Sequence, residues 1–247
     1  MTNSRPGPEI SIITPTYYRP DLLRKCILSI QAQEFKDYEH IIFSDHCPYA
    51  KQVYLEFSED RRIKFFENSE PHIPNVGAIG KNIGIQHANS NIIAYCDDDN
   101  VLLPNHTKII WEAMKNEDID VLYTQYYHVP IGKGNGMIEK VVKRNLDDFS
   151  GYDHIGNTDN LCMAHTVNAL ERYGGWRRDT PGKRDGEDTE LMKRFKEKDA
   201  STVYIDIPTC IYYARAACVI DDIDYKNALK NLKENQYYVF QEELENV

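Results

Sequence analysis

The chain has 247 residues, 41% of them hydrophobic, and carries a formal net charge of −10 at pH 7. The acidic balance argues against a protein that holds a nucleic-acid backbone, because that contact requires a basic face. A single nucleotide remains possible as a ligand, since a metal ion can offset the charge of its phosphates. The length favours one α/β domain over two small ones.

Targeting and redox signals are weak in this sequence. No stretch approaches the roughly 20 apolar residues that span a bilayer, and the opening MTNSRPGPEI lacks the apolar centre of a secretion signal. We therefore expect a soluble, cytoplasmic protein without a transmembrane segment. The six cysteines include no C-x-x-C pair, so they indicate neither a zinc site nor a disulfide framework, and buried thiols are the simpler interpretation.

The first half of the chain alternates β-branched runs with helical patterns. The predicted strands cover 9–14, 40–44, 62–67 and 92–96. The predicted helices begin at Asp21 and cover 51–60 and 75–88. This alternation favours a mostly parallel sheet with helices on both faces.

Polar residues follow several of these strands. Tyr17, Asp45 and the triplet Asp97–Asp99 come after the first, second and fourth predicted strands. In parallel α/β sheets the ligand crevice lies beyond the carboxyl ends of the strands. We therefore expect these residues at one edge of the sheet, although they are far apart in sequence.

The second half of the chain is less regular. It predicts strands at 120–129 and 138–142 around a glycine-rich loop, a helix at 187–198, and a helical pattern from 224 to the end. We predict one domain over 1–223, with a nucleotide half at about 9–104 and an acceptor half at about 105–223. Residues 224–247 would form a C-terminal helical extension.

The acidic triplet carries a chemical prediction. Three consecutive carboxylates at the end of a buried strand repel one another unless a cation or hydrogen-bond donors balance them. Oxygen ligands suit Mg²⁺ or Mn²⁺, and Mg²⁺ is usually held by one or two carboxylates together with substrate phosphates. Asp97, Asp98 and Asp99 therefore predict a metal site, and the alternative is a solvated acidic turn before the next helix.

Three segments together resemble a known family. The run SIITPTYYRPDLLRKCILSIQAQEF, the run NVGAIGKNIGIQHANSNIIAYCDDDN and the pair Glu187-Asp188 are similar, in order and spacing, to the family 2 glycosyltransferases. That family has the GT-A fold and includes bacterial polysaccharide-building enzymes. The resemblance runs from about Ile10 to Phe195 and implies a Rossmann-like nucleotide-diphospho-sugar transferase fold in a single α/β domain.

The resemblance implies a donor site at the first strand. It places Pro15, Thr16 and Tyr17 in the nucleotide pocket, with the ring of Tyr17 stacking on the base. It places Asp45 near the base edge, where a carboxylate can accept an N–H, and Arg19 at the family's cationic position.

The resemblance also assigns residues to the phosphates, the ribose and the metal. Lys81 is implied to contact the diphosphate or the ribose. Asp98, or else Asp97, is implied to bond the ribose, and Asp99 is implied to bind the metal. From the residues alone, Lys81 is equally consistent with a solvated lysine.

Some positions depart from the family's pattern. Ser44 stands where many members carry an acid, and Tyr18 stands where asparagine is usual, so the identity of the base is open. The histidine that often occurs near 212–215 is also absent, which leaves phosphate and water as the remaining metal ligands.

The pair Glu187-Asp188 corresponds to the family's acidic pair at the start of a helix, and Asp188 is implied to be the catalytic base. A carboxylate near the acceptor hydroxyl can take its proton as the oxygen attacks the anomeric carbon. From the residues alone, first-turn acids that favour the helix dipole are the preferred interpretation of the pair. Trp176 resembles a turn residue on the acceptor side, and a buried tryptophan is the other interpretation.

These observations predict an inverting, metal-dependent glycosyltransferase. It would use a nucleoside-diphosphate sugar, with uridine favoured as the base, together with Mn²⁺ or Mg²⁺, and a glycan or other hydroxyl compound as the acceptor. One alternative is a sugar nucleotidyltransferase, which would normally show a glycine-rich loop after the first strand, where TPTYYRPD has no glycine. The other is a non-catalytic nucleotide- or glycan-binding protein of the same fold.

Overall fold

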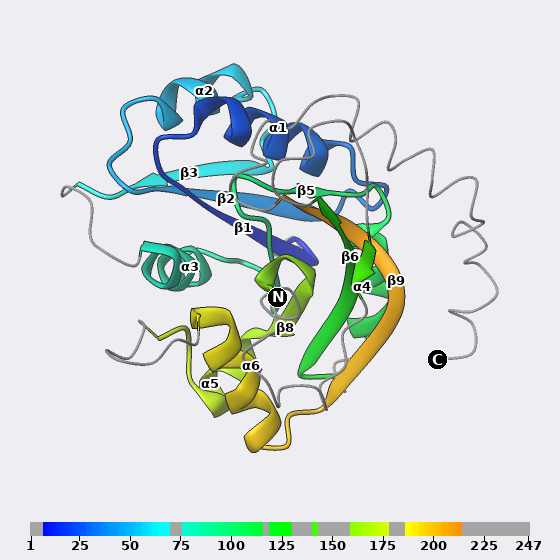
Figure 1. The fold of residues 1–247 in the computed structure, drawn as a ribbon. Helices are drawn as coiled ribbons and strands as arrows, with labels where there is room; N and C mark the ends of the chain where they lie inside the picture. Colours follow the sequence, from blue (N-terminus) through cyan, green and yellow to red (C-terminus); the bar gives the residue numbers. More distant parts are fainter. Residues whose placement is uncertain are drawn as a thin grey trace, which may run out of the picture.

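One mixed sheet organises the molecule (Figure 1). The structure is a computed structural model that describes residues 7–69, 76–115, 119–129, 140–142, 159–177 and 186–213. Within these residues the sheet has nine strands in the order β3-β2-β1-β4-β8-β6-β9-β5, and β7 pairs with β6 beside this path. The predicted single α/β domain is confirmed.

The first four strands form the parallel half of the sheet. They are β1 (Ile10–Thr16), β2 (Tyr38–Ser44), β3 (Ile63–Glu67) and β4 (Ile92–Tyr95). β1 lies between β2 and β4 and is buried along almost its whole length, as expected of a central parallel strand. These strands match the predicted runs, and the carboxyl ends of β1, β2 and β4 lie at the same edge.

Beyond β4 the pairing is mixed. The remaining strands are β5 (Val101–Leu102), β6 (Val121–Val129), β7 (Lys140–Val142), β8 (Met163–Thr166) and β9 (Thr202–Tyr213). β8 is antiparallel to both β4 and β6, whereas β6 and β9 are parallel. The expected parallel pairing therefore holds throughout only for β1 to β4. β8 can pair antiparallel with both of its neighbours, because an antiparallel pair needs no crossover helix between its strands.

Helices cover both faces of the parallel strands (Figure 1). α1 (Pro20–Gln31) and α2 (Ala50–Glu56) lie on one side of β1–β3, and α3 (Val76–Gln86) lies on the other. Alternate residues of β1 serve the two faces, since Ile12 packs in the core cluster with α1 and Ile13 packs in the cluster with α3. The remaining described elements are α4 (His106–Met114), η2 (Asn160–Cys162), α5 (Val167–Tyr173) and α6 (Glu187–Glu197).

Glycine allows α3 to approach the sheet closely. A Cβ atom at Gly84 would lie 2.6 Å from Cγ2 of Ile13, and one at Gly80 would lie 2.9 Å from the ring of Phe43. The glycine-rich character of the predicted 75–88 helix therefore has a packing cause. Close contact with β1 and β2 fixes the position of the other α3 side chains relative to the strand ends.

Some predictions fall outside the described part of the chain. They are the glycine-rich loop at 132–136 and the helical extension at 224–247. The proposed division into a nucleotide half and an acceptor half also stays a prediction. Among the described residues, no helix has the length and apolar character needed to cross a membrane.

Three histidines are buried inside the fold. His40, His106 and His165 have no exposed surface, and burial lowers their pKa values to about 3, about 3 and about 4. In the folded protein they are therefore neutral near pH 5, whereas histidines of the unfolded chain are mostly protonated there.

We expect the three buried histidines to lower the free energy of unfolding as the pH is lowered from 7 to 5. Below the ordinary histidine pKa the unfolded chain gains protons that the folded chain does not, and His40 alone accounts for a loss of about 2 kcal/mol over this interval. Urea denaturation at the two pH values measures this loss. His40→Gln keeps a partner for Thr14 Oγ1 and should lose about 2 kcal/mol less, so equal losses in the two proteins would contradict the assignment.

Candidate functional site

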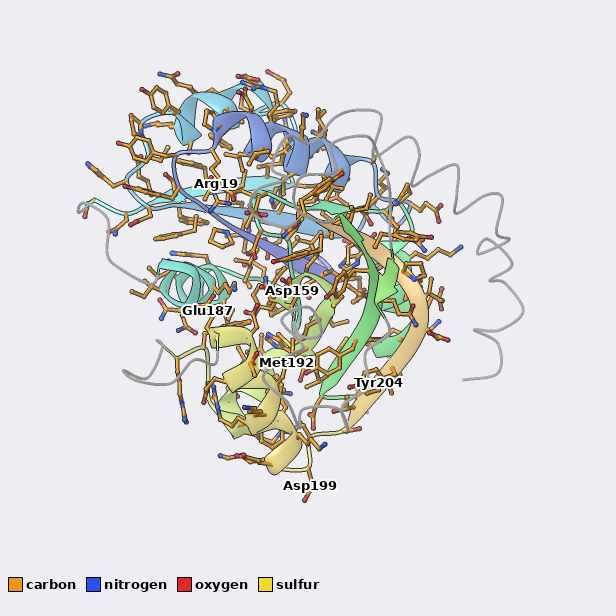
Figure 2. All side chains as sticks on the ribbon, in the orientation of Figure 1. Arg19, Asp159, Glu187, Met192, Asp199 and Tyr204 are labelled. Atoms are coloured by element: carbon orange, nitrogen blue, oxygen red, sulfur yellow. The ribbon has the colours of Figure 1, made fainter. Side chains whose placement is uncertain are left out.

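A cavity of about 670 Å³ opens at the carboxyl ends of the parallel strands. Ten of the twelve predicted site residues line it, namely Pro15, Thr16, Tyr17, Arg19, Lys81, Asp97, Asp98, Asp99, Glu187 and Asp188. Figure 2 shows Arg19, Asp159 and Glu187 around the middle of the molecule, although they come from three separate segments. The fold therefore gathers the candidate donor, metal and base residues at one place, as expected of this sheet edge.

Arg19 and Thr16 hold the acidic triplet against the end of β1. Thr16 Oγ1 donates a hydrogen bond to Asp98 Oδ2 at 2.7 Å. Arg19 Nη1 donates to Asp98 Oδ1 at 3.1 Å and also to the Asp99 carboxylate. Thr16 is the last residue of β1 and Arg19 directly precedes α1, so the loop between these elements is oriented by the triplet.

Burial makes the triplet difficult to ionise completely. Burial raises the pKa of Asp98 to about 7, although Arg19 lowers it. Burial, followed by the charge of Asp97, also raises the pKa of Asp99 above its ordinary range. These carboxyl groups would therefore gain stability as anions from a further cation nearby.

Two amides connect the triplet to the second half of the chain. Asn160 Nδ2 donates to Asp97 Oδ1 at 3.3 Å, and Asn100 Oδ1 accepts from the backbone N–H of Tyr213 at 2.9 Å. Asn160 is 1% exposed, and its Oδ1 has no hydrogen-bond partner among the residues that the structure describes. An acceptor that is buried without a partner at a cavity wall favours a ligand with a donor group or a metal-bound water.

Lys81 lies between the two acids that open α6. Its side chain is 3% exposed, and Nζ lies 2.7 Å from Glu187 Oε1 and 3.4 Å from Asp188 Oδ1. Burial raises the pKa of both carboxyl groups and Lys81 lowers them. Burial opposes the charge on Lys81, but its neighbouring carboxylates hold the lysine pKa above its ordinary value.

Two predicted site residues do not line the cavity. Asp45 is buried beside it and accepts a hydrogen bond from Asn68 Nδ2 at 3.0 Å. Trp176 is 4% exposed, with Lys81 Nζ 4.4 Å from its ring centre and its Nε1 donating to Tyr95 Oη at 2.8 Å. The acceptor-side role of Trp176 stays a prediction, and the position of its ring agrees with the interpretation as a buried tryptophan.

The cavity also contains residues that were not predicted from sequence. They are Gly77, Asn100, Asp159, Asn160, Gly186, Tyr212 and Tyr213. Asn100 adjoins the triplet, and Asp159 accepts from Leu161 N at the start of η2, so polar residues beside an apolar run were the available signals. The tyrosines lie on β9, where β-branched and aromatic residues favoured a strand.

The donor set suits a metal that is shared with a substrate. Within the described part of the chain, no three acidic, histidine or cysteine side chains form a complete metal site. Asp99 lines the cavity with an oxygen ligand, and one or two carboxylates with substrate phosphates are the usual arrangement for Mg²⁺. The residues therefore fit an ion that arrives with a phosphorylated ligand better than an ion held by protein alone.

Comparison with known proteins assigns the family. The family described as Glycosyl transferase family 2 matches residues 11–174, more than half of the chain. The chain therefore belongs to glycosyl transferase family 2. The family resemblance seen in the sequence motifs is confirmed.

The chain is similar to curated proteins over part of its length. The chain is 36% identical over 148 residues, 58% of its length, to the GalNAc(5)-diNAcBac-PP-undecaprenol beta-1,3-glucosyltransferase of Campylobacter jejuni. It is 27% identical over 135 residues, 54% of its length, to the UDP-Glc:alpha-D-GlcNAc-diphosphoundecaprenol beta-1,3-glucosyltransferase WfgD of Escherichia coli. The matches span 43% and 50% of these relatives, so the chain corresponds to about half of their length.

Solved structures share the fold. S. aureus TarS 1-349 in complex with UDP matches with a TM-score of 0.65 and 15% identity, over 83% of this chain and 60% of that one. The mannosyltransferase PcManGT from Pyrobaculum calidifontis, in complex with GDP-Man and Mn²⁺, matches with a TM-score of 0.59 and 14% identity, over 83% and 57%. At such identities the likeness establishes the fold alone, and it confirms the expected GT-A type.

Asn82 connects α3 to Trp176, in the segment that follows α5. Its Nδ2 donates to the carbonyl oxygen of Trp176 at 2.8 Å, and its Oδ1 accepts from the Trp176 backbone N–H at 3.1 Å. A single side chain therefore satisfies both backbone groups of Trp176. This pair of bonds fixes the position of Trp176 relative to α3.

We expect Asn82→Ala to lower the free energy of unfolding by about 1–3 kcal/mol, because two partly buried hydrogen bonds are lost. Urea denaturation at pH 7 provides the measurement. Gln86→Ala, at an exposed position of the same helix, is the matched control and should change stability by no more than about 0.5 kcal/mol. Equal effects of the two substitutions would show that the bonds to Trp176 contribute nothing.

Proposed function

We propose that this chain moves a sugar from a nucleoside-diphosphate sugar, with a UDP-sugar favoured, to a hydroxyl group of a glycan or related acceptor. The transfer inverts the anomeric centre and requires Mn²⁺ or Mg²⁺. The observation that carries the proposal is the single cavity in which the end of β1, the acidic triplet and the pair Glu187-Asp188 meet. Two solved structures with the same fold support the donor, since TarS 1-349 is solved with UDP and with UDP-GlcNAc.

The donor would lie along the ends of β1 and β4. Tyr17 lines the cavity beside Pro15 and Thr16 and is 37% exposed, and its ring would stack on the base. Asp98, which accepts a hydrogen bond from Thr16, would also accept hydrogen bonds from the ribose hydroxyls. Asp45 directly follows β2 and would lie near the edge of the base.

The charge of the cavity supports the metal. Its lining carries six acidic residues, Asp97, Asp98, Asp99, Asp159, Glu187 and Asp188, against the two cations Arg19 and Lys81. A diphosphate entering such a lining would be repelled unless a further cation accompanied it. Asp99 would hold this metal, which would supply positive charge next to the departing diphosphate.

Asp188 would act as the base. The acceptor oxygen attacks the anomeric carbon while its proton passes to an Asp188 carboxylate oxygen. The bond from that carbon to the diphosphate oxygen breaks, and the nucleoside diphosphate leaves with the bonding electron pair. A single displacement of this kind inverts the configuration at the carbon.

The sequence left two alternative functions open. Membership of glycosyl transferase family 2 argues against a sugar nucleotidyltransferase. For a non-catalytic binding protein, Asp188 would be dispensable. Asp188→Asn should instead abolish transfer while nucleotide binding remains.

We expect UDP with Mn²⁺ to raise the melting temperature, whereas GDP, CDP and dTDP raise it less. A ligand that binds only the folded state stabilises it by about 2.7 kcal/mol at one hundred times its Kd. A thermal-shift panel of the four nucleotides, with and without Mn²⁺, measures this effect. Asp99→Asn should lose the metal-dependent part and Asp188→Asn should keep it. If no nucleotide gives a metal-dependent shift, the donor site is assigned wrongly.

A further inference from the structure

Lys81 lines the cavity, and its ammonium group contacts Glu187, Asp188 and the ring of Trp176. We propose that Lys81 is a positioning residue that holds Asp188 and Glu187 in place at the cavity wall, instead of a contact to the donor diphosphate. The significance for catalysis rests on the proposed function, because Asp188 is the base only in that reaction. The contacts themselves are independent of it.

The surroundings of the ammonium group are the first support. Nζ can donate three hydrogen bonds, and it lies 2.7 Å from Glu187 Oε1 and 3.4 Å from Asp188 Oδ1. On another side it lies 4.4 Å from the ring centre of Trp176, at cation–π distance. With a side chain only 3% exposed, Lys81 would have to leave these groups to reach a phosphate.

The platform beneath Lys81 is itself fixed. Trp176 Nε1 donates to Tyr95 Oη at 2.8 Å, and this hydroxyl lies 2.6 Å from His165 Nε2. Asn82 hydrogen-bonds both backbone groups of Trp176. The ring under the ammonium therefore has little freedom, and a rigid support is what a positioning residue requires.

The backbone of α3 makes room for the same carboxylates. Gly77 lies one turn before Lys81, and a Cβ atom there would lie 2.4 Å from Glu187 Oε1. No side chain larger than hydrogen fits while Glu187 keeps its position. One face of α3 therefore supplies both the space for the Glu187 carboxylate and the charge that binds it.

Several groups face Asp188, and they come from four other parts of the fold and from its own helix. Lys81 of α3 lowers its pKa, whereas burial and Asp97 raise it, and the backbone N–H of Asn160 lowers it. Glu187 precedes it on α6, and the charge of Asp188 raises the pKa of Tyr95 on β4. Lys81 is the cation that opposes the burial of this carboxylate.

We expect Lys81→Met to raise the pKa of Asp188 by at least one unit, a tenfold change in its protonation. The charge is removed while the apolar stem over Trp176 remains. The pKa is measured by carboxyl ¹³C NMR on aspartate-labelled protein, with the signal assigned through Asp188→Asn. The dissociation constant of UDP with Mn²⁺, measured on the same variant, should change less than threefold.

Lys81→Arg keeps the charge and should hold the Asp188 pKa within half a unit of the parent value. Glu187→Gln leaves Lys81 in place for Asp188 alone and should lower that pKa, which gives a second test if Lys81→Met does not fold. An unchanged pKa in Lys81→Met overturns the proposal, and so does a tenfold loss of UDP affinity in that variant. Failure of the parent protein to bind any nucleotide with Mn²⁺ would contradict the proposed function and leave the positioning role of Lys81 unaffected.

Discussion

The balance between buried carboxylates and two cations governs the arrangement around the cavity. Six acidic side chains line it, and Arg19 and Lys81 are the cations in that lining. Burial strengthens the repulsion among the acids, so each cation also joins parts of the chain that would otherwise separate. Arg19 connects the segment after β1 to the acidic triplet, and Lys81 connects α3 to the start of α6.

The mixed half of the sheet brings the remaining groups to that balance. The parallel strands β1 and β4 end at the same edge and supply Thr16 and the triplet. The antiparallel strand β8 places η2 beside them, so that Asn160 reaches Asp97. β9 contributes the Tyr213 backbone N–H that holds Asn100. The two halves of the sheet therefore meet at the acidic triplet, and neither forms the cavity alone.

Local patterns predicted the parallel strands and the candidate residues, but not the pairing between distant ones. Strand β9 was not predicted because Asp206 and Pro208 interrupt its alternating pattern. Helices α4 and α5 were not predicted because each is too short to show a clear helical period. The resemblance assigned Lys81 to the donor, and its ion pair with Glu187, 106 residues away, could not be predicted from local spacing. The burial of Trp176 depends equally on Asn82 and Tyr95, which no local spacing connects to it.

The two cations differ in their freedom to respond to a ligand. The Arg19 side chain is 40% exposed, so it can release its carboxylate partners to a metal and pair with a phosphate instead, at little cost in desolvation. The Lys81 side chain is 3% exposed and packs on a fixed ring, so removing it would leave buried carboxylates without compensation. A base needs a carboxylate that is both ionised and partly desolvated. In the proposed reaction, pairing with an immobile lysine would reconcile the two, and the proposed donor side would keep an arginine that can adjust.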